Sequence, residues 1–292
     1  MSGGDIVTNV VETIREGLNR GTVIPYLGPG ILKLAGTSAV PEAPEILVDR
    51  LTAKASVPHK IRKNLTAAAQ FIENFKHRKT VAAAMTEAFR SPMPPTALHH
   101  YLASVPALKL IVHAWYDDLP QKALAGRAGW SMVQGVSQAE HHGSWYHFFN
   151  ADGTPGTADT AAASAPLLYQ PIGSIAPASN FLVSDSDFVE VLTEIDIQTP
   201  IPEAVQDIRK GRSFVFLGCR FNTQLERIFA WEIMKRSSDK HWAVLPETLT
   251  RNEERFLEIY NVERIVMPLA EFAAQLTGID ERPYEPALAK AS

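Results

Sequence analysis

Residues 213–245 read SFVFLGCRFNTQLERIFAWEIMKRSSDKHWAVL: a short apolar run, an amphipathic stretch and a second short apolar run. SFVFLG and HWAVL have the length and composition of buried strands, and TQLERIFAWEIMKR between them has the spacing of a helix. The alternation continues with the helix-like RNEERFLEIY at 251–260 and the strand-like VERIVM at 262–267. This order predicts a parallel sheet with helices on both of its faces.

Two further apolar runs belong to the same sheet. VIPYLG at 23–28 follows a helical stripe of apolar residues and leads directly into Pro29-Gly30. LKLIVHA at 108–114 follows the helix-like TALHHYLASVP. The predicted fold is a doubly wound, mainly parallel Rossmann-like α/β sheet. Its predicted strands lie at residues 23–28, 108–114, 214–218, 242–245 and 262–267.

The rest of the chain is interpreted as insertions into one α/β domain that spans residues 1–280. Helical stretches broken by prolines predict a helical insert at about 42–106. Residues 126–166 predict a small β-rich insert, which ends in the turn-rich NADGTPGTADTAAASAP, interpreted as a flexible loop. Residues 281–292 are expected to form a frayed tail.

Composition narrows the possible partners. The net charge is −4, and no basic cluster is longer than residues 60–63, so we expect no nucleic-acid partner. The single cysteine, Cys219, cannot form an internal disulfide, and no paired cysteines predict a metal site. No apolar run is long enough to cross a bilayer, which predicts a cytoplasmic protein without a membrane partner. A homo-oligomer is compatible with this composition.

The candidate ligand contacts are strand ends, because doubly wound sheets bind ligands beyond the carboxyl ends of their strands. These ends are Gly28-Pro29-Gly30 and residues 113–117, 171–173 and 218–220. The predicted cofactor-binding residues are Gly28, Pro29, Gly30, Trp115, Tyr116, Asp117, Gly218 and Arg220.

These segments resemble the sirtuin-like NAD-binding family, including its bacterial NAD-hydrolysing defence branch. VIPYLGPGIL stands where that family has a strand and a glycine-alanine-glycine turn. ALHHYLASVPALKLIVHAWYDDLPQKAL is similar to its His-x-x-Leu helix and its strand ending Thr-Thr-Asn-Tyr-Asp, with Tyr116, Asp117, Asp118 and Leu119 in register. LLYQPIGSI stands at its His-Gly strand, and FVFLGCRFN at its strand ending Gly-Tyr-Ser. The resemblance covers about residues 23–276 and implies an NAD-binding fold.

The departures from the family pattern fall on its reactive positions. Trp115 stands at the asparagine that positions the ribose and the attacking water, and Ile172 at the histidine that acts as general base. Neither side chain exchanges a proton near neutral pH. Pro29 replaces the alanine of the glycine turn, and Leu32 and Arg220 replace serines. Catalysis by the family mechanism is therefore predicted to be absent.

Three functions remain open on this basis. The first is a non-catalytic domain that binds a nucleotide or another small anion, or that regulates a protein partner. The second is an NAD hydrolase or NAD-dependent deacylase with rearranged catalytic residues. The third is a pure interaction protein whose cofactor site is filled by Pro29, Trp115 and Ile172. NAD or ADP-ribose is expected to bind weakly, because Pro29 removes one N–H and Leu32 one hydroxyl, whereas a smaller anion fits near Arg220.

Other polar residues are possible substitutes for the missing groups. His113 and Asp117 are the weak catalytic candidates; the alternatives are a hydrogen-bonded core histidine and a helix N-cap. Arg220 suits a carboxylate or phosphate ligand, or a salt bridge to Asp117 or Glu226.

Two further features have a structural and a chemical interpretation. Cys219 is either a thiolate activated by a following helix or a buried thiol. The run HHGSWYH, with His141, His142 and His147, suggests a metal, but adjacent histidines on a strand face opposite sides, which favours a polar hairpin.

Overall fold

The computed structural model describes residues 3–36, 38–194 and 200–279. Their main element is an eight-stranded sheet, with a separate two-stranded ribbon of β6 (Gly173–Ser174) and β7 (Asn180–Phe181). In sheet order the strands are β10 (Val262–Ile265), β9 (His241–Val244), β8 (Ser213–Leu217), β1 (Val23–Leu27), β2 (Leu110–His113), β5 (Leu167–Gln170), β3 (Ser131–Gly135) and β4 (Tyr146–Asn150). All neighbours run parallel except β3 and β4, so the predicted mainly parallel sheet is confirmed.

β1 lies in the middle of the sheet, and this position explains why its sequence is continuously apolar. All five of its residues are buried, and it pairs with β8 over its whole length. Its pairing with β2 begins only at Tyr26. Pro25, which has no N–H to donate, therefore lies one residue before that second ladder begins, and a central strand tolerates it there.

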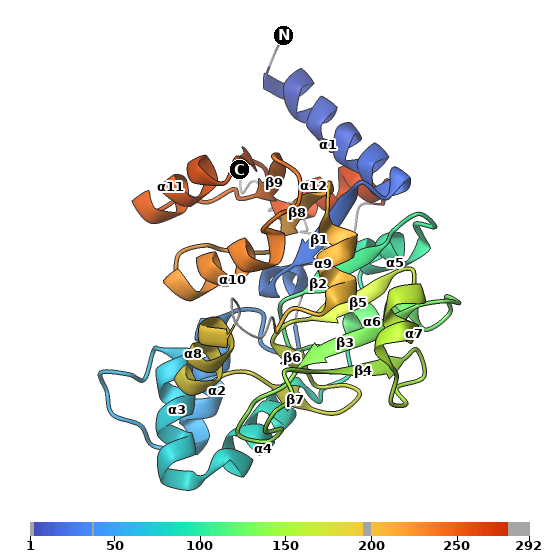
Figure 1. Cartoon of the computed structure of the whole chain (residues 1–292). Helices are drawn as coiled ribbons and strands as arrows, with labels where there is room; N and C mark the ends of the chain where they lie inside the picture. The colour runs from blue at the N-terminus through green and yellow to red at the C-terminus, as the bar shows by residue number, and fades with distance from the viewer. Residues whose placement is uncertain (1–2, 37, 195–199, 280–292) are drawn as a thin grey trace, which may run out of the picture.

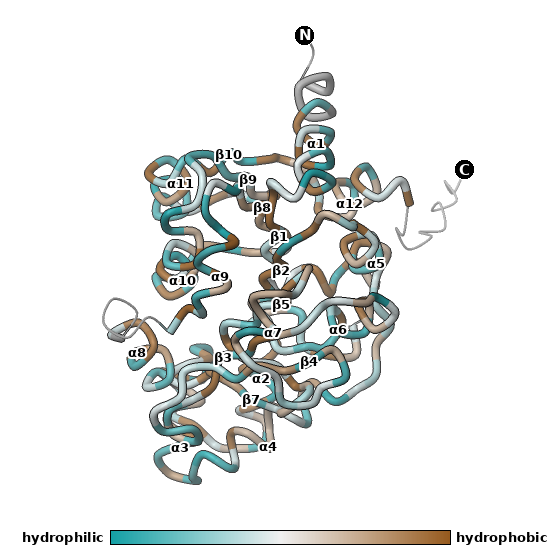
Figure 2. The backbone as a smooth tube through the Cα atoms, turned by 45° about the vertical axis from the view of Figure 1, so that its right-hand side comes forward, coloured by the Kyte–Doolittle hydropathy of each residue, from teal (hydrophilic) through white to brown (hydrophobic). Residues whose placement is uncertain are grey.

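Helices cover both faces of the sheet. Figure 2 shows the strands between α9, α10 and α11 on one side and α5 and α12 on the other. The helices are α1 (Gly3–Arg20), α2 (Pro44–Lys54), α3 (Leu65–Lys76), α4 (Arg78–Phe89), α5 (Ala97–Ser104), α6 (Leu119–Leu124), α7 (Ala158–Ala163), α8 (Asp185–Glu194), α9 (Glu203–Arg209), α10 (Gln224–Met234), α11 (Arg251–Ile259) and α12 (Leu269–Thr277). A 3₁₀ helix, η1 (Pro29–Ala35), follows β1. Among the described residues, none of these helices is long and apolar enough to span a membrane.

The helical insert forms a lobe beyond one end of the sheet. Its helices α2, α3 and α4 pack on one another, and α8 lies beside them (Figure 1). α5, which the sequence places in the same insert, contacts α6 and α12 instead. In the second insert, β3 joins the main sheet between β5 and β4.

The stretch at 150–166 differs from the expected loop, because it contains α7. The side chain of Thr157 caps this helix by accepting a hydrogen bond from the backbone N–H of Thr160 at 3.2 Å. Alanine, which fills most of the helix, has the highest helix propensity. The prediction of a loop over this whole stretch is therefore wrong. The predicted frayed tail, 281–292, lies outside the described residues.

Candidate functional site

A cavity of about 680 Å³ opens at the carboxyl edge of the sheet. The ends of β8, β1, β2 and β5 meet there because these strands are neighbours in the sheet. Its lining from this side comprises Tyr26, Gly28, Pro29, Ala114, Trp115, Tyr116, Ile172, Cys219, Arg220 and Phe221. The strand ends identified in the sequence thus converge on one cavity whose volume suits a small molecule. Of the predicted contacts, Gly30, Asp117 and Gly218 lie outside its lining.

The opposite wall comes from helices that lie outside the strand ends predicted from the sequence. Its residues are Pro44 and Glu45 of α2, residues 63–66 at the start of α3, Asp185 and Phe188 of α8, and Thr223, Gln224, Leu225, Glu226, Phe229 and Ala230 around α10. A signal for part of this wall is present in the sequence. In doubly wound folds the helix after a strand begins at the ligand edge, so the first turn of α10 was a candidate.

The glycine turn after β1 uses its N–H groups within the protein. Gly28 donates to the carbonyl oxygen of Leu217 and Gly30 to that of Gly218, both at 2.9 Å. Pro29 between them has no N–H. The donors expected to face a phosphate are therefore engaged by the end of β8.

These glycines also allow two backbone segments to touch. A Cβ on Gly28 would lie 2.6 Å from the carbonyl oxygen of Gly218, and one on Gly30 would lie 2.9 Å from the same atom. Gly218 itself has a φ of +66°, and a Cβ there would lie 2.3 Å from the nitrogen of Ile31. The close approach of the turn to β8 explains all three glycines without a ligand.

Arg220 lines the cavity, but a buried carboxylate holds its guanidinium. Its Nε lies 3.0 Å and its Nη2 3.1 Å from the two oxygens of Glu253, a bidentate pair. Glu247 lies farther away, at 3.7 Å. Burial raises the pKa of the Glu253 carboxyl, but hydrogen bonds from Arg220 and Thr250 outweigh burial and leave that pKa below its ordinary value. The partner is thus neither Asp117 nor Glu226, the two that the sequence suggested.

Trp115 and Ile172 form apolar wall where the family resemblance implies polar groups. Both side chains are buried and border the cavity. The indole Nε1 of Trp115 donates to the carbonyl oxygen of Pro41 at 2.7 Å, and its ring packs on Phe89 and Tyr116. Its only polar atom is therefore already bonded.

His113 and Asp117 form a buried pair behind this wall. His113 Nε2 lies 3.1 Å from Asp117 Oδ2, and Asp117 Oδ1 accepts a hydrogen bond from the N–H of Leu119 at the start of α6. Burial raises the pKa of Asp117, but His113, together with His99 and the N–H of Leu119, outweighs burial, so the pKa lies below its ordinary value. Neither residue lines the cavity, and their contacts orient the turn into α6.

Cys219 and the histidine run do not provide an obvious reactive centre. Burial raises the pKa of the Cys219 thiol far above its ordinary value, which disfavours a thiolate. His141 and His142 lie in the connection between β3 and β4, not in a strand as expected. His141 Nε2 lies 3.1 Å from Asn180 Oδ1, and its ring contacts that of His147. Within the described part of the chain, no group of three or more metal-ligating side chains is present.

Glu226 is the half-buried carboxylate of the cavity. Its Oε2 accepts hydrogen bonds from the N–H (3.0 Å) and the hydroxyl (2.8 Å) of Thr223, which forms a capping box at the start of α10. Burial raises the pKa of this carboxyl and Glu45 raises it further; the bonds from Thr223 oppose this, and the net shift is upward. Its Oε1 accepts no hydrogen bond from any residue that the structure describes.

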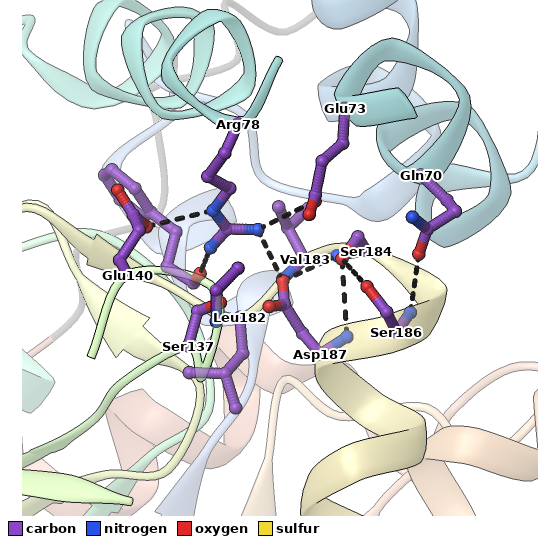
Figure 3. Close-up of polar contacts among 12 residues, drawn as sticks. Gln70, Glu73, Arg78, Ser137, Glu140, Leu182, Val183, Ser184, Ser186 and Asp187 are labelled. Atoms are coloured by element: carbon purple, nitrogen blue, oxygen red, sulfur yellow. Dashed lines mark hydrogen bonds and ion pairs between the residues drawn. The ribbon is translucent and has the colours of Figure 1, made fainter. Parts of the chain in front are cut away.

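An ion cluster fixes the far wall of the cavity, and Figure 3 shows Arg78 of α4 at its centre. Arg78 lies 2.8 Å from a carboxylate oxygen of Asp187, 3.2 Å from one of Glu73 and 2.9 Å from one of Glu140. Its guanidinium also donates to the carbonyl oxygen of Phe181. The cluster ties α3 and α4 to α8, and the first turns of both α3 and α8 border the cavity.

Comparison with known proteins identifies the family of this chain through a family model. A solved structure described as "Structural Basis for the Mechanism and Regulation of Sir2 Enzymes" is similar over 94% of this chain and 96% of its own, at 12% identity and a TM-score of 0.45. A search of the curated proteins gave no match. A family model, the SIR2-like domain, matches residues 109–265, which is more than half of the chain and runs from β2 to β10. The protein belongs to the SIR2-like family.

Proposed function

We propose that this protein is a non-catalytic SIR2-like domain that binds a nucleoside-sized ligand with a flat ring in its strand-end cavity. The observation that carries the proposal is the cavity itself. A space of about 680 Å³ remains between the strand ends and the helical lobe, although Trp115 and Ile172 stand at its wall. A filled cofactor site, the third function considered above, is disfavoured by that volume.

The chemistry of the lining supports binding without the family reaction. Trp115 and Ile172 do not transfer protons near neutral pH. His113 and Asp117, the substitutes considered from the sequence, are buried outside the lining. A general base must come within hydrogen-bond reach of the proton that it removes, and neither residue borders the space where a ligand would lie.

The same lining disfavours an intact dinucleotide. Diphosphates in such folds bind to backbone N–H groups at the glycine turn, and here Gly28 and Gly30 donate to β8. NAD and ADP-ribose are therefore proposed to bind more weakly than a nucleoside without phosphates, because the N–H groups of Gly28 and Gly30 are not free to bind their diphosphate.

Calorimetry with adenosine, ADP-ribose and NAD tests this function. We expect adenosine to bind and to bind more tightly than either diphosphate. Gln224→Trp, at the first position of α10 and on the cavity wall, should weaken adenosine binding at least about tenfold by occupying the cavity. The matched control is Arg251→Trp, at the first position of α11, which lies outside the cavity and should leave binding unchanged. Absence of nucleoside binding, or equal loss in both variants, would overturn the proposal.

A second candidate function is an NAD hydrolase with a relocated acid. The observation in its favour is Glu226, a half-buried carboxyl at the cavity whose pKa burial raises. Nicotinamide release from NAD that disappears in Glu226→Gln would establish this function in place of the first.

A further inference from the structure

We infer that the cavity selects an organic cation, a flat aromatic ring carrying an amidinium or protonated amino group that pairs with Glu226. The inference rests on the proposed function, because it concerns the same cavity, and it specifies the charge of the ligand. It differs from the small anion expected from the strand-end residues alone.

The charged groups around the cavity favour a cation. Three carboxylates, Glu45, Asp185 and Glu226, line it against two basic side chains, Lys63 and Arg220. Both oxygens of Glu253 already pair with Arg220, so the charge of that guanidinium is largely neutralised. An anionic ligand would meet three carboxylates there, and of the two basic side chains Arg220 is already paired with a carboxylate.

Of the five charged groups, Glu226 is expected to have the strongest electrostatic effect on a bound ligand. Glu45, Asp185 and Lys63 are exposed, and water and salt screen their charges. Glu226 is half-buried, its Oε2 is fixed by Thr223, and its Oε1 has no partner in the described part of the chain. The result is an oriented acceptor beside the cavity. Burial deprives this carboxylate of water and so raises its pKa, and a cation bound beside it would favour the charged form in place of that water.

Aromatic side chains supply the second half of the recognition. Those that line the cavity are Tyr26, Trp115, Tyr116, Phe188, Phe221 and Phe229. Aromatic faces stack on flat rings and attract cations, because their faces are electron-rich. A cationic ring therefore satisfies both the carboxylate and the aromatic wall, whereas an aliphatic amine or an anionic ring satisfies only one.

Three probes of one shape separate charge from shape: benzamidine (cationic), benzamide (neutral) and benzoate (anionic). By calorimetry we expect benzamidine to bind at least about tenfold more tightly than benzamide, and benzoate to bind most weakly, because a charged hydrogen bond adds at least that factor. In Glu226→Gln the preference for benzamidine should disappear. Glutamine preserves the capping box, so this variant keeps its helix start.

The matched control is Glu258→Gln, the same change at an exposed position of α11, which should keep the wild-type order. If Glu226→Gln fails to fold, the pH dependence of binding to the wild-type protein tests the inference instead. Benzamidine affinity should fall on acidification as Glu226 is protonated, while benzamide affinity stays constant. Equal affinity for the three probes, or tightest binding of benzoate, overturns the inference but leaves the ring-binding function intact. If neither the probes nor adenosine bind, both fail.

Discussion

At Gly218 the backbone takes a left-handed turn where β8 meets the glycine turn after β1. The space that a Cβ would need is occupied by the nitrogen of Ile31. Glycine is enriched at phosphate sites for the same physical reason, the absence of a side chain, so the sequence alone does not separate the two roles. The backbone hydrogen bonds do separate them, because they show where the N–H groups of Gly28 and Gly30 point.

Gly218→Ala should lower the free energy of unfolding by about 2 to 4 kcal/mol, because it adds a backbone clash to an unfavourable φ. Urea denaturation measures this. The matched control is Gly126→Ala, where a Cβ meets nothing within 4 Å, and we expect a change within about 0.5 kcal/mol. A fully stable Gly218→Ala protein with weakened ligand binding would instead assign this glycine to the ligand.

The position of the buried pair His113–Asp117 outside the cavity lining bears on a second prediction, the absence of NAD hydrolysis. When the wild-type protein is incubated with NAD at the concentrations ordinarily used in enzyme assays, it should release no nicotinamide. The reason is that Trp115 and Ile172 stand at the family's reactive positions. Nicotinamide assayed by chromatography is the measurement. Robust turnover that is lost in His113→Ala or Asp117→Ala would show that the pair reaches the substrate despite its position outside the cavity lining.

Among the elements, the helical lobe and α8 are joined by two side chains, Arg78 and Gln70. Arg78 neutralises Asp187, whose carboxylate also accepts the N–H groups of Val183 and Ser184 ahead of α8. A second link is independent of charge: Gln70 of α3 accepts a hydrogen bond from the N–H of Ser186 at 2.7 Å. Together they hold the first turn of α8 against α3.

Arg78→Ala should lower the free energy of unfolding by about 3 to 5 kcal/mol, because it leaves the Asp187 carboxylate buried without a counter-charge. Hydrogen exchange should rise in α3 and α8 together. The comparison variant is Arg20→Ala, which removes an exposed pair with Glu16 and should change stability by less than about 1 kcal/mol. Equal effects of the two variants would contradict the proposed role of the cluster.

The elements also show how far sequence reasoning reached. Each predicted strand was found, because a strand buried on both faces must be a short apolar run, and such runs are visible in the sequence. α7 was missed because it is a short alanine-rich helix flanked by glycines and prolines, which indicate turns. The pairing of Arg220 with Glu253 was missed because it joins segments 33 residues apart, and only the folded geometry selects that carboxylate from its neighbours.

For the whole molecule, stability should depend on pH through buried histidines. Burial lowers the pKa of His99 to about 4 from 6.5, and lowers that of His241 to about 4 as well. In the unfolded chain both recover ordinary values, so the unfolded state takes up protons first on acidification. These histidines therefore do not reduce the free energy of unfolding above pH 6.5, and they lower it progressively as the pH falls toward 4.

His99→Gln should therefore flatten the pH dependence of unfolding between pH 6.5 and 4 by roughly 3 kcal/mol. Glutamine suits this position because His99 is the third residue of the α5 capping box with Thr96. Urea melts at several pH values measure the effect, and exposed His59→Gln serves as the control. Parallel curves for wild type and His99→Gln would refute the assignment.

The place of β1 between β2 and β8 has a consequence for synthesis on the ribosome. β2 becomes available about ninety residues after β1, but β8 begins only at Ser213, so one side of β1 stays unpaired while most of the chain is made. An apolar strand with an open edge is a template for the wrong partner, and long-range parallel pairing is slow to form. Chains that stop before β8 should therefore aggregate, whereas chains that extend beyond it can close the sheet, which makes the emergence of residues 213–217 the step that commits the nascent chain to its fold.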